Sequence, residues 1–204
     1  MKILAIAAHP DDLEISVGGT LRKYVQARHE VRGVVVTVPY LRETRTAEAR
    51  AGAAALGFEL VVLDFPPDEL VFTRKLVGCF DSCLDEFPAD VVFTQWIHDS
   101  HQDHVNVAQA TLAATRKNRC TLYMYEETIP GGIVPYAFRP QVYFDISDTM
   151  ETKIEASLKH ASEVAKCGRE EWESGIRGRA MFRGRQIGVT YAEAFELVKE
   201  IKRL

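Results

Sequence analysis

Short apolar runs alternate with helical patterns along this chain of 204 residues. The first runs are apolar on both faces of an expected strand, which is typical of a parallel sheet that helices cover on both sides. The expected strands are 2–8, 30–38, 60–63, 90–94, 120–125 and 142–145. The expected helices are 20–28, 45–56, 73–86, 104–115, 151–164 and 191–202. The sequence therefore predicts an α/β fold with a Rossmann-like, mostly parallel sheet and helices on both faces.

We expect one domain over residues 1–204, because this length suits one large domain and the sequence shows no internal repeat. The segment at about 167–190 does not follow the alternation of strands and helices. Residues 167–188 contain five arginines and five glycines. One interpretation of this composition is a flexible, solvated loop, and the other is a lid or a subunit contact beside a binding pocket.

Composition limits the class of partner. With 25 Lys and Arg against 29 Asp and Glu, the net charge is −4, whereas a general nucleic-acid binder carries a basic excess. The apolar run before His9 is too short for the core of a signal peptide, and no run reaches the roughly 18 residues of a membrane span. The four cysteines show no paired C-x-x-C spacing, which is typical of reduced thiols. We expect a cytoplasmic homo-oligomer that acts on a small molecule and binds neither nucleic acid nor membrane.

Two clusters of histidine and aspartate follow expected strands. The sequence HPDD at 9–12 comes directly after the strand 2–8, and HQDH at 101–104 comes shortly after the strand 90–94. The carboxyl ends of parallel strands share one edge of a sheet, where ligands of such folds bind. Imidazole and carboxylate groups from separate segments make a metal site, and catalytic zinc takes three protein ligands and one water. The candidate ligands are His9, Asp12 and His104.

Two groups of these clusters are left over for proton transfer. A water activated by a metal needs a general base, and a developing oxyanion and a departing amine need a proton donor. Asp11, next to Asp12, fits the first need, and His101, one helical turn before His104, fits the second. A lone Asp-Asp pair is ordinarily a helix cap in contact with solvent. The histidine before the pair and the His-x-x-His pattern elsewhere favour metal binding.

The stretches AHPDDLEISVGGTL and HQDH together resemble the two motifs of the LmbE-like (PIG-L) family of metal-dependent N-deacetylases. The stretch RTAEARAGAAALG resembles the family's helix that bears arginine and glutamate. The stretch GRQIGVTYAEAFELVK resembles the end of its bacterial members. The resemblance therefore extends over nearly the whole chain, and it implies the family's Rossmann-like fold.

The resemblance also implies a role for each residue of the two clusters. Asp11 matches the general base, and His101 matches the imidazole that acts as acid or electrophile at the acyl oxygen. Asp103 would orient His101 or its neighbour. The implied zinc ligands are His9, Asp12 and His104. The same nitrogen and oxygen ligands also accept Fe²⁺, Co²⁺ or Ni²⁺.

Several residues near these motifs have two interpretations. Arg45, at the start of an expected helix, is either a surface charge or a substrate contact, since a guanidinium group can clamp a carboxylate or phosphate. His160 lies within the expected helix 151–164, and we expect it at the surface. Structural roles are expected for Glu14, Gly18 and Gly19.

The function that the resemblance implies is hydrolysis of an N-acetyl group from an amino sugar or a related glycosylated small molecule, with zinc as cofactor. One alternative is hydrolysis of another amide, such as an N-formyl group in secondary metabolism, with the same ligands. A second alternative is a non-catalytic nucleotide-binding module on a doubly wound sheet. The first turn disfavours the module, because it carries HPDDLEISVGG in place of G-x-G-x-x-G, and its adjacent carboxylates repel a pyrophosphate.

Overall fold

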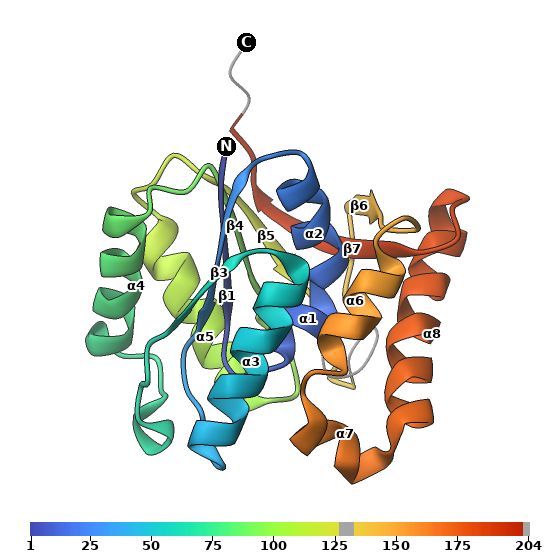
Figure 1. Ribbon diagram of the computed structural model, residues 1–204. Coiled ribbons are helices and arrows are strands. Elements are labelled where there is room, and N and C mark those ends of the chain that lie inside the picture. Colours follow the sequence, from blue (N-terminus) through green and yellow to red (C-terminus); the bar gives the residue numbers. More distant parts are fainter. Residues whose placement is uncertain (127–132, 202–204) are drawn as a thin grey trace.

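The computed structural model describes residues 1–126 and 133–201, and a sheet of seven strands forms the centre of this part of the chain (Figure 1). The strands lie in the order β3-β2-β1-β4-β5-β7-β6. The first five along the chain pair in parallel, whereas β7 runs antiparallel to both β5 and β6. The predicted α/β fold with a mostly parallel sheet is confirmed. The strands are β1 (Lys2–Ala7), β2 (Glu30–Val35), β3 (Glu59–Val62), β4 (Val91–Gln95), β5 (Thr121–Tyr125), β6 (Val142–Asp145) and β7 (Ala192–Lys199).

Helices cover both faces of the sheet. Two of them pack together on one face, as Figure 1 shows; these are α4 (Arg74–Glu86) and α5 (Gln102–Thr115). The opposite face carries α1 (Asp12–Ser16), α2 (Gly18–Gln26), α3 (Arg42–Leu56) and α6 (Met150–Ser157). Among the helices of the described ranges, none combines the length and the apolar character that a membrane span needs.

The side chains of β1 explain why its sequence is apolar throughout. Leu4 and Ile6 pack into the core under α4 and α5, whereas Ile3 and Ala5 pack into the core under α2 and α3. Successive side chains of a strand point to opposite faces, so a strand with helices on both sides buries all of them.

The direction of the strand order changes between β1 and β4. β2 and β3 follow on one side of β1, and β5 follows on the far side of β4. The connection after β1 leads to α1 on one face, and the connection after β4 leads to α5 on the opposite face. In open α/β sheets, ligands bind where two such connections diverge. Both clusters of histidine and aspartate lie on these two connections.

The C-terminal third differs from the sequence prediction in three places. The range 191–202, expected as a helix, forms strand β7 within its described residues. The segment 167–190, for which we left open a solvated loop or a lid or subunit contact, is mostly helix α8 (Arg169–Ile187), so the loop interpretation is wrong. The expected helix 151–164 is interrupted, because α6 ends at Ser157 and α7 (Ala161–Cys167) begins after His160.

Packing accounts for the strand and the long helix. The sequence AEAFELVK of β7 has good helix formers, but its backbone pairs on both sides, with β5 and with β6. In α8, Ile176 and Ala180 stand one helical turn apart and join Ile154 of α6 in one apolar cluster. Contacts with distant segments therefore determine that β7 is a strand and that α8 is a helix.

Candidate active site

The first cluster forms a tight turn between β1 and α1. Asp11 takes a φ of 92°, a region that residues other than glycine rarely adopt and that aspartate tolerates better than most. The turn brings the side chain of Asp12 back toward His9, whose backbone N–H donates to Asp12 Oδ2 at 2.7 Å. This bond fixes the carboxylate of Asp12 relative to the backbone of His9.

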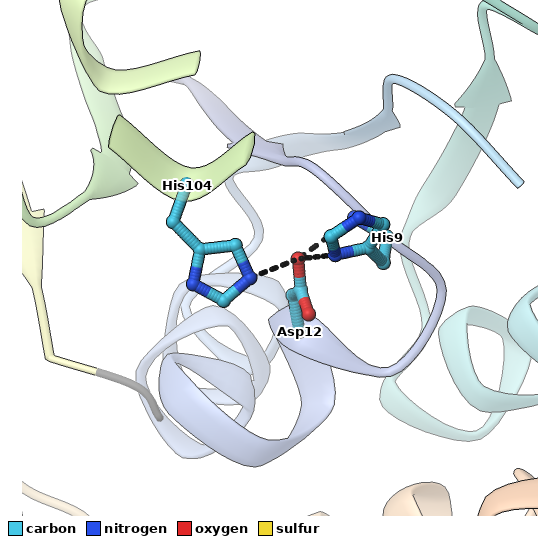
Figure 2. Close-up of side chains that lie close together, drawn as sticks. All are labelled: His9, Asp12 and His104. Carbon is cyan, nitrogen blue, oxygen red and sulfur yellow. Dashed lines mark hydrogen bonds and ion pairs between the residues drawn. The ribbon is translucent and has the colours of Figure 1, made fainter. Parts of the chain in front are cut away.

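His9, Asp12 and His104 converge at the carboxyl edge of the sheet (Figure 2). Asp12 Oδ2 lies 3.7 Å from His9 Nδ1 and 3.7 Å from His104 Nε2. All three residues are buried. Ligand bonds of about 2.1 Å in a tetrahedron place the ligand atoms roughly 3.4 Å apart, so small shifts close the three around an ion. These donors therefore fit a divalent metal.

Two polar residues that the sequence analysis missed hold this group. Gln95, at the end of β4 and fully buried, donates from Nε2 to Asp12 Oδ2 at 2.8 Å and accepts the backbone N–H of Ala8 at 3.1 Å. Asp99 Oδ1 lies 3.3 Å from His104 Nδ1. A partner on one ring nitrogen orients the other nitrogen toward a metal. Gln95 ends β4 and Asp99 follows it, so both lie at the edge of the sheet that carries the two clusters. This position in the sequence could have indicated that they belong to the site.

His101 and Asp103 lie beside the metal group. The carboxylate of Asp103 contacts His9 Nε2 at 3.0 Å, and its backbone N–H donates to His101 Nδ1 at 3.2 Å. The neutral ring of His101 therefore carries its proton on Nε2. Burial, together with the charges of His104 and His9, lowers the pKa of His101, which favours this neutral form. His9, His101 and Asp103 also converge as a second group, but its His101 is exposed while the first group is buried throughout.

Asp11 faces the same site without belonging to the metal group. Burial, and next the charge of Asp12, raise the pKa of its carboxyl well above the usual range, although His160 and Arg45 counteract part of this effect. Arg45 Nη2 donates to Asp11 Oδ1 at 3.1 Å and to the carbonyl of Pro10 at 3.0 Å. A carboxyl group with a raised pKa is suited to take up a proton near neutral pH.

A cavity of about 520 Å³ opens over these groups. The side chain of Arg45 is only 4% exposed in its wall, and its Nε lies 3.3 Å from Glu163 Oε1. The guanidinium therefore donates hydrogen bonds to protein acceptors from Nη2, whereas its Nε forms an ion pair with Glu163 without a hydrogen bond. A direct contact with substrate stays a prediction. Besides the residues of the two clusters, the wall is formed by Ile15, Pro39, Tyr40, Arg45 and Glu163.

The surface position expected for His160 is wrong. Its side chain is fully buried, and its Nε2 lies 3.2 Å from Glu14 Oε2. His160 precedes α7 because the expected helix is interrupted there, and this break turns it inward. Glu14 has the structural role that we expected, since it connects α1 to this residue and packs against Gly52 of α3.

The fold and the site together define a class of protein. A Rossmann-like sheet that carries a His-Asp-His group, a further carboxylate and a further imidazole at its carboxyl edge has the parts of a metal-dependent hydrolase. The family model described as "PIG-L: GlcNAc-PI de-N-acetylase" matches residues 4–115, which include both clusters. The chain belongs to this family, whose deacetylases are metal-dependent, and it is a hydrolytic N-deacetylase.

Individual proteins agree with this assignment. The chain is 28% identical over 225 residues to "Diacetylchitobiose deacetylase" of Thermococcus kodakarensis, covering 98% of this chain and 84% of that protein. It is 31% identical to "Uncharacterized deacetylase YaiS" of Escherichia coli, covering 78% and 90% of the two chains. The solved N,N'-diacetylchitobiose deacetylase of Pyrococcus horikoshii superposes with a TM-score of 0.83 at 27% identity, covering 97% of this chain and 83% of that one.

Proposed function

We propose that the protein removes the N-acetyl group of an amino sugar or a related glycosylated small molecule in a zinc-dependent reaction. The observation that carries this proposal is the buried His-Asp-His group with Asp11 beside it, in a cavity of about 520 Å³. The substrates named for the relatives, which are N-acetylated sugars, support the choice of acetyl over formyl.

The metal site is assigned to His9, Asp12 and His104, and zinc bound there would lower the pKa of a water and polarise the acyl carbonyl. Asp11 takes the proton of the attacking water. His101 donates a hydrogen bond from Nε2 to the acyl oxygen as negative charge develops on it. The oxygen of the water bonds to the acyl carbon, and the proton held by Asp11 then passes to the amide nitrogen as the C–N bond breaks. The products are acetic acid and the free amine, which ionise to acetate and an ammonium ion near neutral pH.

Arg45 is proposed to contact the substrate from the cavity wall. Its bond to Asp11 gives it a second role, because the same guanidinium fixes the carboxylate that takes the proton. Arg45→Lys should therefore raise KM and also lower kcat. Lysine cannot reproduce the several fixed N–H directions of the guanidinium.

The proposal also covers the oligomeric state and the cellular compartment of the enzyme. We propose a homo-oligomer in the cytoplasm, with helix α8 as a subunit contact. Met181, Phe182 and Ile187 of α8 expose 46%, 55% and 42% of their surface, and large exposed apolar side chains support an interface. The four cysteines are free thiols, which supports a reducing compartment. Light scattering after size exclusion tests the oligomer, and a monomer would contradict it.

The experiment for the proposed function combines metal analysis with an amine-release assay. The substrates are N,N'-diacetylchitobiose, N-acetylglucosamine and N-formylglucosamine. Wild type should contain one zinc per chain and release amine from an acetylated sugar, and His104→Ala should lose both properties. His98→Ala is the matched control, because His98 belongs to the same connection but not to the metal group. Faster release from the formyl sugar, or full activity of His104→Ala, would contradict the proposal.

A further inference from the structure

Helix α7 contributes a carboxylate to the cavity that none of the motifs contains. Glu163 lies in the cavity wall, and its side chain is 12% exposed. It comes from the C-terminal part of the chain, beyond the matched residues 4–115. The site is therefore completed by a segment that stands far from both clusters in the sequence.

The carboxylate of Glu163 has fixed partners on both oxygens. Oε1 lies 3.3 Å from Arg45 Nε, and it also accepts the hydroxyl of Tyr40. Oε2 accepts a hydrogen bond from Lys166 at 2.7 Å. Burial alone would raise the pKa of Glu163, but the bonds from Lys166 and Tyr40 and the charge of Arg45 outweigh burial and lower it. Glu163 is therefore an ionised, oriented group.

Arg45 connects this group to the turn of the first cluster. Its Nε faces Glu163, while its Nη2 donates to Asp11 and to the carbonyl of Pro10. Its guanidinium also lies over the ring of Tyr40, 4.5 Å from the ring centre. The contact between Nε and Glu163 is an ion pair without a hydrogen bond. Together with the hydrogen bonds of Nη2 and the contact with the Tyr40 ring, it limits rotation of the planar guanidinium.

We propose that Glu163 is a positioning residue, which fixes the guanidinium of Arg45 so that Arg45 holds the carboxylate of Asp11 in place for proton transfer. The proposal rests on the role of Asp11 in the proposed function. Asp11 is the member of the site with a positive φ, so its backbone does not favour the observed geometry by itself. Arg45 stabilises this geometry from outside the turn, because it donates hydrogen bonds to the carboxylate of Asp11 and to the carbonyl of Pro10.

Contacts other than those of Glu163 also hold α7 against the rest of the molecule. Glu48 of α3 accepts the backbone N–H of Ser162 at 2.8 Å and its hydroxyl at 2.6 Å. His160 contacts Glu14 immediately before the helix. A change at Glu163 therefore leaves other contacts that hold α7. Glu48 provides a matched control, because its carboxylate ties α3 to α7 through Ser162, whereas the carboxylate of Glu163 faces Arg45.

The test uses Glu163→Gln, which keeps the shape of the side chain and removes its charge. We expect kcat on the acetylated sugar to fall at least about tenfold, with zinc content within twofold of wild type. KM should rise as well, because displacement of Arg45 also weakens its proposed contact with the substrate. Glu48→Gln should keep kcat within twofold. In an Arg45→Met background, Glu163→Gln should change kcat by less than twofold, since the connection is already broken.

Several outcomes would overturn the proposal: an unchanged kcat, a rise in KM alone, an equal loss of kcat in Glu48→Gln, or an undiminished effect of Glu163→Gln in the Arg45→Met background.

Crystal structures of wild type and Glu163→Gln add a readout that needs no activity. The Arg45–Asp11 contact of 3.1 Å should persist in wild type and be lost in the variant, and its persistence in the variant would also overturn the proposal. Glu163→Asp replaces Glu163→Gln if the latter does not fold, and the same results are expected. A wild type without activity would contradict the proposed function alone, and the crystal structures would still decide the role of Glu163.

Discussion

Asp11 is the residue on which the proposed proton transfers depend. It lies next to a proposed metal ligand, yet its own carboxylate is held by Arg45, so its function can be separated from metal binding. Asp11→Asn keeps the shape of the side chain and removes the proton acceptor. We expect kcat to fall by about 10²-fold or more, the usual size of a general-base effect, while zinc content stays near that of wild type. Steady-state kinetics and metal analysis of the same preparation check this. Wild-type turnover by Asp11→Asn would exclude Asp11 as the base.

Gly52 shows how closely the structure behind the site is packed. A Cβ added there would lie 2.6 Å from Glu14 Oε1, so it would force Glu14 away from His160. Gly52→Ala should lower the free energy of unfolding by about 1–3 kcal/mol, the usual cost of overpacking. Gly78→Ala in α4 is the matched control, because nothing lies within 4 Å of the added Cβ, and alanine stabilises a helix by about 0.5–1 kcal/mol relative to glycine. Urea unfolding measures both, and equal stabilisation by the two changes would contradict the packing argument.

The candidate site was predictable at the residues that bear its chemistry. His9, Asp12 and His104 follow strands of a parallel sheet, and topology alone brings such positions to one edge. Gln95 and Glu163 were not predictable in the same way. Gln95 acts through hydrogen bonds to a buried carboxylate, and Glu163 reaches the cavity from α7, a helix that begins only because an expected longer one is interrupted.

At the scale of elements, the first six strands were predictable, and the helices and the strand that follow β6 were predictable only in part. The strands β1 to β5 have continuous or nearly continuous apolar sequences, which only a doubly covered sheet buries. Helix α8 lacks a continuous apolar face; some of its arginines instead pair with carboxylates of other segments. Arg183 binds Glu126 through two bonds of 2.6 Å, and Arg177 binds Glu151 through two bonds of 2.7 Å. Periodicity of apolar residues cannot show such pairs.

Glu193 connects three elements through one buried carboxylate. It accepts the backbone N–H groups of Gly19 and Thr20 at 2.9 and 2.7 Å, at the start of α2, and it pairs with Lys153 of α6. The side chains of Lys153 and Glu193 are 2% and 4% exposed, and burial lowers the pKa of Lys153 although Glu193 opposes this effect. Loss of the carboxylate charge leaves a lysine buried without its counter-ion.

Glu193→Gln should therefore lower the free energy of unfolding by about 3–5 kcal/mol, the usual cost of removing one partner of a buried ion pair. Glu155→Gln, on the exposed face of α6, should change the free energy of unfolding by less than about 0.5 kcal/mol. Chemical unfolding followed by circular dichroism measures both variants. A loss in Glu193→Gln no larger than in Glu155→Gln would show that the pair does not stabilise the junction of α2, α6 and β7.

At the scale of the whole molecule, we propose that the chain is one domain. Beyond the matched residues 4–115, β7 pairs with β5 and β6 inside the sheet, and β5 pairs with β4 of the matched part. The two parts of the chain are therefore joined through the sheet. A single sheet of this kind should unfold in one cooperative transition. The two tryptophans report on opposite parts of the molecule. Trp96 is buried after β4, and Trp172 of α8 donates to Ser157 at 3.3 Å.

Trp172→Phe leaves Trp96 as the reporter, and Trp96→Phe leaves Trp172. In each variant, the urea midpoint from fluorescence should coincide with the midpoint from far-ultraviolet circular dichroism. The reason is that β7 pairs with β5 and contacts α8, so loss of β7 from the sheet exposes β5 and frees α8 together. Comparison of two probes within one variant removes the effect of the substitution on stability itself. If Trp172 fluorescence changes at lower urea than the circular dichroism of the same protein, α8 and β7 form a separate unit, and the proposal of one domain is wrong.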